Sequence, residues 1–222
     1  MNETTSVYPT ELRPTVQARF PDGRVLEGAR GTPIEEFILG AGTPAGDRVV
    51  ASLMNGRLRE LCFPLTEDAD LVPVTTGSND GARIYRRSLS FLMIAAAAEV
   101  LPDQVITILH SMPFGGYYCE RGNAERLTDD ELLALKRRMR ELVDADLPIN
   151  NVRMPLDEAL AFFREQGDLE KADLFARRRK AYLTLYELNG VKDYFHGFMV
   201  PRTRYLDLFD LRHYNDGFIL QF

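Results

Sequence analysis

The chain has 222 residues, of which 45% are hydrophobic and 27% charged, a composition that excludes wholesale disorder and allows one or two domains. The formal net charge of −6 argues against a strongly basic nucleic-acid-binding surface over the whole chain. The most apolar stretch, 88–98, lies between charged residues and is too short to cross a bilayer, which needs ~20 residues. Two cysteines are too few for a disulfide framework, and the first residues lack a secretory pattern, so we expect a cytoplasmic protein.

The first half of the chain predicts short strands and one short helix. Thr32 and Pro33, followed by two acidic residues, predict a helix that ends at Gly40. Asn55-Gly56 between two apolar runs is a strong hairpin signal, and the turn formers at 21–23 predict another hairpin. The expected strands are 15–20, 24–27, 49–54, 57–61 and 71–74. Two hairpins and a helix in this length are typical of a small β-grasp-like module.

The second half predicts a mixture of helices and aromatic-rich strands, so the fold class that we expect is α+β. The expected helices are 82–101, 128–144, 154–163 and 168–188, and the expected strands are 105–110, 116–120, 194–200, 205–208 and 217–222. Turn formers fill 75–81, which predicts a domain boundary between 1–76 and 81–222. The chain is apolar up to its last residue, which predicts either a further domain that follows or a C-terminal strand that packs into a sheet, and we favour the first.

Few residues suggest chemistry directly. A Walker-type phosphate loop is missing from the sequence, so we expect neither ATP nor Mg²⁺ to bind to such an element here. The three histidines, His110, His196 and His213, have no zinc-type spacing to one another or to Cys62 or Cys119. The basic run 177–180 allows two interpretations, a solvated helix face or a patch that grips RNA or a nucleotide phosphate.

The order and spacing of several stretches resemble known families. The first half resembles a TGS domain, the ubiquitin-like module at the front of threonyl-tRNA synthetases, and the second half resembles the domain of those enzymes that edits mischarged tRNA. The stretches that carry the resemblance are FPDGR at 20–24, VASLMNGR at 50–57, TEDADL at 66–71, GGYYCE at 115–120, GDLEK at 167–171 and GFMVPRT at 197–203.

The resemblance also locates an altered editing site. That family uses a His-x-x-x-His pair on the first helix and a Cys-x-x-x-His pair near the end. The corresponding residues here are Arg87 and Phe91, then Phe195 and Met199, and none of them provides a comparable lone pair or proton acceptor. The lysine of that site is kept as Lys171. The resemblance therefore implies a cleft without zinc or hydrolysis, with Arg87 and Lys171 as anion contacts beside aromatic residues.

A narrower resemblance concerns certain uridine kinase-like proteins, in which a region of this kind precedes a P-loop kinase. It rests on SMPFGGYY at 111–118 and DYFHG at 193–197. This resemblance implies a non-catalytic region that binds RNA or a nucleotide and regulates a following kinase, whose own domain would use ATP and Mg²⁺. Two alternatives remain open, namely a remodelled hydrolase that uses Lys171, His196 and Arg87, and a structural domain that forms homo-oligomers. No membrane partner is expected.

Overall fold

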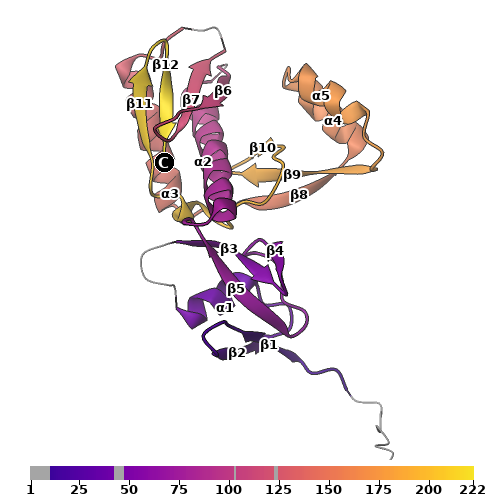
Figure 1. The fold of residues 1–222 in the computed structure, drawn as a ribbon. Helices are drawn as coiled ribbons and strands as arrows, with labels where there is room; N and C mark the ends of the chain where they lie inside the picture. Colours follow the sequence, from indigo (N-terminus) through magenta and orange to yellow (C-terminus); the bar gives the residue numbers. More distant parts are fainter. Residues whose placement is uncertain (1–10, 43–47, 103, 123–124) are drawn as a thin grey trace, which may run out of the picture.

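The structure is a computed structural model that describes residues 11–42, 48–102, 104–122 and 125–222 (Figure 1). Its N-terminal part is a five-stranded sheet in the order β2-β1-β5-β3-β4, with one parallel pair, β1 and β5. The strands are β1 (Thr15–Arg19), β2 (Val25–Ala29), β3 (Val49–Met54), β4 (Arg57–Arg59) and β5 (Ala69–Thr75). Helix α1 (Ile34–Ala41) packs against this sheet, so the expected α+β arrangement of two hairpins and a helix is confirmed.

Local sequence signals explain this sheet. Val16 and Ala18 alternate with more exposed neighbours on β1 and have no solvent exposure. Asn55 and Gly56 both have positive φ, as the tight turn between β3 and β4 requires. One detail differs from the expectation, because α1 begins at Ile34 and Pro33 is its N-cap residue, without a side-chain hydrogen bond.

Helix α2 (Asn79–Val100) is the long central helix of the molecule. It begins three residues earlier than expected, because the Ser78 hydroxyl accepts a hydrogen bond from the Gly81 amide and caps it. A Cβ added at Gly81 would lie 2.0 Å from the Thr75 carbonyl oxygen, so the helix leaves β5 in close contact with its end. The turn formers at 75–81 therefore include the first turn of a helix, and the domain boundary proposed there stays a prediction.

Beside α2 stands a four-stranded antiparallel sheet in the order β11-β12-β7-β6. Its strands are β6 (Ile106–Ser111), β7 (Tyr117–Arg121), β11 (Asp210–Tyr214) and β12 (Gly217–Gln221). Helix α3 (Asp129–Asp144) begins with the expected capping box of Thr128 and Glu131. The strand expected at 205–208 is wrong, since a short 3₁₀ turn (Thr203–Tyr205) stands before β11.

A third sheet, in the order β10-β9-β8, extends away from α2 and carries two short helices (Figure 1). Its elements are β8 (Asn150–Pro155), α4 (Leu156–Glu165), α5 (Leu169–Ala176), β9 (Tyr182–Leu188) and β10 (Val191–Asp193). The helix expected over 168–188 is therefore wrong, because it ends at Ala176 and a strand follows. Asn189 and Gly190 have positive φ and close a hairpin rather than a helix. The strand expected at 194–200 is also wrong, since that segment is irregular.

The N-terminal sheet and the rest of the molecule are joined by polar contacts as well as by apolar packing. Arg48 forms an ion pair with Asp207 at 2.7 Å, and Glu35 accepts hydrogen bonds from Arg204 and Tyr205, each at 2.7 Å. One cluster of buried apolar residues includes side chains from both parts. None of the helices in the described ranges is long and apolar enough to span a membrane.

Candidate functional site

The structure brings together the four positions that the resemblance had placed at the altered editing site. Arg87 on α2 donates a hydrogen bond of 2.6 Å from Nη1 to the carbonyl oxygen of Phe198. The Phe91 ring, one helical turn further along, packs against the Phe195 ring with centroids 5.2 Å apart. Met199 follows in the same irregular segment, so α2 and the segment 194–200 together form this region.

This region is filled by its own side chains. Phe91 is 0% exposed and Met199 is 1% exposed, so neither can contact a ligand here without a rearrangement. A Cβ at Gly197 would lie within 2.9 Å of the Arg87 guanidinium, which shows how closely the segment approaches α2. The expectation of an open aromatic pocket around Phe91 and Met199 is therefore corrected, because bulky side chains occupy the space between the helix and the segment.

Lys171 lies outside this region, on α5. Its Nζ is 2.9 Å from Asp168 Oδ2 and 2.8 Å from Asp193 Oδ1. Burial opposes the charge of this ammonium group, but its hydrogen bond to Asp193 and the negative charges of Asp193 and Asp168 raise the pKa of Lys171 overall. The lysine is therefore charged and already compensated by two carboxylates, which weakens it as an anion contact.

An open pocket of about 380 Å³ lies next to the filled region, and we call it the β9 pocket. Strand β9 provides one wall, the segment 194–198 another, and Glu60 of the N-terminal part also lines it. Of the five predicted site residues, Phe195 lines this pocket, whereas Arg87, Phe91, Lys171 and Met199 do not. Its aromatic side chains are Tyr182, Tyr186, Tyr194, Phe195 and Phe198, and its basic ones are Arg178, Lys180 and His196.

The basic run 177–180 contributes to this pocket because it is not helical. Since α5 ends at Ala176, the interpretation of this run as a solvated helix face is wrong. The Arg178 guanidinium lies 5.7 Å from the centroid of the Tyr194 ring and 5.8 Å from that of Phe175. Lys180 lies two residues further on and also lines the pocket. Two of the four basic side chains of this run, Arg178 and Lys180, thus lie at one pocket.

Sequence reasoning missed the residues that β9 supplies. Tyr182, Thr184 and Tyr186 line the pocket and alternate along the strand, as side chains on one face of a strand do. The short alternation Leu183-Thr184-Leu185 was the available signal. A helical interpretation of that segment would have placed the same residues on different faces.

Glu60 closes the inner side of the β9 pocket. Its Oε1 accepts hydrogen bonds from the Tyr186 hydroxyl at 2.5 Å and from the Met199 amide at 3.0 Å, and its Oε2 accepts one from Asn151 at 2.9 Å. Burial, together with the negative charge of Glu60, raises the pKa of Tyr186 well above its usual range. Tyr186 therefore stays a neutral donor, and the carboxylate holds β9 and the segment 194–200 in place.

The titratable groups of the region do not form a hydrolytic set. A base and a nucleophile must be within hydrogen-bonding distance of each other. Lys171, His196 and Arg87 all lie in the described ranges, and no hydrogen bond or ion pair joins any two of them. Burial raises the pKa of the Cys62 thiol to about 11 and that of Cys119 to about 12, so both are protonated near neutrality. In the described ranges no three His, Cys, Asp or Glu side chains gather as metal ligands would.

Comparison with known proteins relates the chain to part of an aminoacyl-tRNA synthetase. It is 30% identical over 197 residues to the threonine–tRNA ligase of Syntrophotalea carbinolica, which covers 88% of this chain and 31% of the ligase. It is 30% identical to threonine–tRNA ligase 1 of Bacillus subtilis and 29% identical to the ligase of Laribacter hongkongensis, with 30% of each ligase covered. No family model matches the chain.

These relatives support the TGS-like and editing-like interpretation of the sequence, because the similarity extends over most of the chain. The α+β architecture agrees with it. The chain spans about 30% of the length of these ligases, so their whole activity is not transferred to it. None of these matches supports the narrower resemblance to uridine kinase-like proteins.

Proposed function

We propose that the chain is an editing-like region that binds the end of a single-stranded RNA in the β9 pocket and does not hydrolyse an ester there. The observation that carries the proposal is the combination of aromatic rings with Arg178 and Lys180 around one small opening. Its volume of about 380 Å³ suits a nucleotide or two rather than a duplex. The relatives are named as ligases of tRNA, a nucleic acid.

The chemistry of the lining favours a nucleic acid. Base stacking on an aromatic side chain contributes about 1–3 kcal/mol per base, and four of the rings that line the pocket are partly exposed, namely Tyr182, Tyr194, Phe195 and Phe198. Arg178 and Lys180 provide positive charge for one or two phosphates. The overall charge of −6 is compatible with this, because the contact is local.

The lack of hydrolysis follows from the residues at the four family positions. Arginine is permanently protonated, phenylalanine has no polar atom, and a methionine thioether is a weak acceptor. Arg87, Phe91, Phe195 and Met199 therefore provide neither a base nor a ligand for zinc. We expect the purified protein to carry no stoichiometric zinc at this place and to leave seryl-tRNA intact. Turnover that is lost on Lys171→Ala would favour the remodelled hydrolase instead.

Binding is tested by fluorescence anisotropy with a labelled single-stranded RNA over a series of salt concentrations. The double variant Arg178→Ala/Lys180→Ala should bind several-fold more weakly, and its salt slope should fall by about 1.4, or ~0.7 for each lost phosphate contact. The matched control is Arg177→Ala/Arg179→Ala, which removes the same charge from exposed residues that do not line the pocket.

Two results would contradict the proposal. Equal losses in the double variant and its control would show that only general charge matters. A parent protein without salt-dependent RNA binding would favour the structural or oligomerising interpretation, which analytical ultracentrifugation can examine.

A second, more specific proposal is that this region regulates an attached nucleoside kinase. It is supported by the sequence resemblance alone. In that case ATP and Mg²⁺ would bind to the kinase domain. Sequencing the parent gene beyond Phe222 tests it, because a Gly-x-x-x-x-Gly-Lys-Ser/Thr loop should follow.

A further inference from the structure

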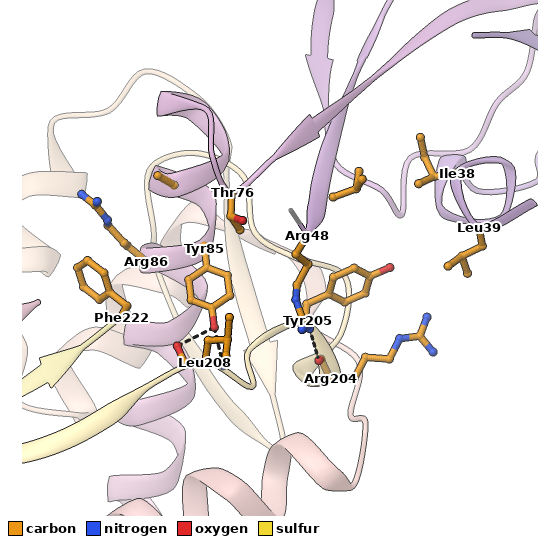
Figure 2. Close-up of a pocket in the computed structure, with 12 residues that line it drawn as sticks. Ile38, Leu39, Arg48, Thr76, Tyr85, Arg86, Arg204, Tyr205, Leu208 and Phe222 are labelled. Carbon is orange, nitrogen blue, oxygen red and sulfur yellow. Dashed lines mark hydrogen bonds between the residues drawn. The ribbon is translucent and has the colours of Figure 1, made fainter. Parts of the chain in front are cut away.

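A larger hollow lies where the N-terminal sheet meets α2 and the C-terminal segment, and we call it the junction pocket (Figure 2). Its volume of about 810 Å³ is within the range of ~300–1,000 Å³ that is usual for small-molecule sites. Its walls come from α1, the start of β3, the first turns of α2 and the residues 204–222. It shares no lining residue with the β9 pocket.

Two aromatic rings of this pocket are held in fixed positions. The Tyr85 hydroxyl donates to the Leu208 carbonyl oxygen at 2.8 Å and accepts from the Leu208 amide at 2.9 Å. The Tyr205 hydroxyl donates to Glu35 at 2.7 Å. Their polar atoms are thus satisfied inside the protein, and Figure 2 shows both rings beside the hollow. Rings that are fixed before binding lose little conformational entropy when a planar ligand packs on them.

The charged side chains that line this pocket, among the described residues, are all positive. Three arginines line it, and no aspartate or glutamate is among its lining residues in the described part of the chain. Two of these arginines already have partners, because Arg48 pairs with Asp207 at 2.7 Å and Arg204 pairs with Glu35 at 2.7 Å and with Asp146 at 3.4 Å.

Arg86 is the third, and it differs from the other two. It is exposed and makes no ion pair with any described residue, and its guanidinium lies 4.7 Å from the centroid of the Phe222 ring. An uncompensated guanidinium beside a ring can bind a phosphate with two parallel hydrogen bonds. The pocket therefore offers an anion contact next to surfaces for a planar group.

From this arrangement we infer that the junction pocket is a nucleotide site, in which Arg86 binds the phosphate and the base enters the hollow between the accessible edges of Tyr85 and Tyr205 and the exposed Leu208 side chain. The inference goes beyond the proposed function, because it concerns a different pocket and a mononucleotide rather than an RNA end. Arg48 and Arg204 also line the hollow and add positive charge to it, although each is paired with a carboxylate that does not line it. A nucleotide that fills the hollow contacts both the N-terminal part and α2.

The inference is tested by isothermal titration calorimetry on the full chain with ADP, UDP, adenosine and inorganic pyrophosphate as probes. We expect at least one of the two nucleotides to bind, with adenosine and pyrophosphate each at least ten-fold weaker than that nucleotide. Arg86→Ala should weaken nucleotide binding about ten-fold. The matched control is Arg83→Ala, on the same helix, because Arg83 is exposed, pairs with Asp80 and does not line the pocket.

Four results would overturn the inference. The first three are binding to Arg86→Ala at the parent affinity, pyrophosphate binding as tightly as the nucleotides, and no binding of either nucleotide. Loss of nucleotide binding in Arg178→Ala/Lys180→Ala alone would likewise overturn it, because the nucleotide would then occupy the β9 pocket. Since Arg86 is exposed, Arg86→Ala should melt at the parent temperature, so that a loss of binding is not a loss of folding. RNA binding by this variant should be unchanged, which separates this test from that of the proposed function.

Discussion

Glu60 is the residue whose replacement tests the contact between the N-terminal part and the β9 pocket most directly. In Glu60→Ala the Met199 amide, on a residue that is 1% exposed, loses its acceptor. The Tyr186 hydroxyl keeps the Gly197 carbonyl oxygen, 2.9 Å away, as an acceptor. An unpaired buried donor costs about 1–3 kcal/mol, and a lost hydrogen bond to a charged group costs about 1.5–3 kcal/mol. We therefore expect a loss of about 3 kcal/mol in the free energy of unfolding.

Urea unfolding followed by circular dichroism measures this loss. Glu60→Gln retains a side-chain acceptor oxygen for Met199 and should lose only about 1 kcal/mol. Glu67→Ala is the control, because Glu67 is exposed and such surface changes usually stay within about 0.5 kcal/mol. If Glu60→Ala unfolds at the same urea concentration as the control, the carboxylate does not hold the two parts together, and the description of the β9 pocket as closed by Glu60 is refuted.

Three further predictions concern stability and reactivity. Gly81→Ala should destabilise the protein by more than ~2 kcal/mol in the same assay, although alanine favours helices, because the new Cβ would lie 2.0 Å from the Thr75 carbonyl oxygen. The hydrogen bond from Lys136 lowers the pKa of Asp210 to about 2, below the value of ~3.9 in the unfolded chain. The Asp210 carboxylate therefore contributes fully to stability above about pH 3.9, and this contribution disappears as the pH falls through 2. Acid titrations of the parent and Asp210→Asn should therefore differ near neutrality and converge toward pH 2. Cys62 should react with iodoacetamide more slowly than free cysteine at pH 8, with a rate that rises up to about pH 11, since burial raises its pKa to about 11; a fast reaction at pH 8 would contradict this.

Much of the fold could be predicted where a local signal decides the structure. The Asn55-Gly56 turn and the capping box of Thr128 fix a hairpin and a helix start, and both are confirmed. The helix expected over 168–188 was wrong in its second part, although the charged residues of that segment favour a helix. Its end at Ala176 depends on packing, since Phe175 of α5 and Leu183 of β9 belong to one small core with α4. Such contacts override local preference.

The candidate site could be predicted only in part. The family spacing placed Arg87, Phe91, Phe195 and Met199 together, and the structure has them in one region. Spacing says which residues are neighbours but not whether their side chains fill the space between them. The role of Glu60 was hidden from the sequence, because its acceptor atom meets an amide 139 positions away in the chain.

Neighbouring arginines on α2 contact different parts of the molecule. Arg86 faces the junction pocket, whereas Arg87 holds the carbonyl oxygen of Phe198, a residue of the β9 pocket wall. A ligand that turns α2 when it engages Arg86 must also displace Arg87 and move that wall. The two pockets would then be thermodynamically linked, and the factor by which a nucleotide changes RNA affinity must equal the factor by which RNA changes nucleotide affinity. Helix α2 would then couple ligand binding in one pocket to the affinity of the other.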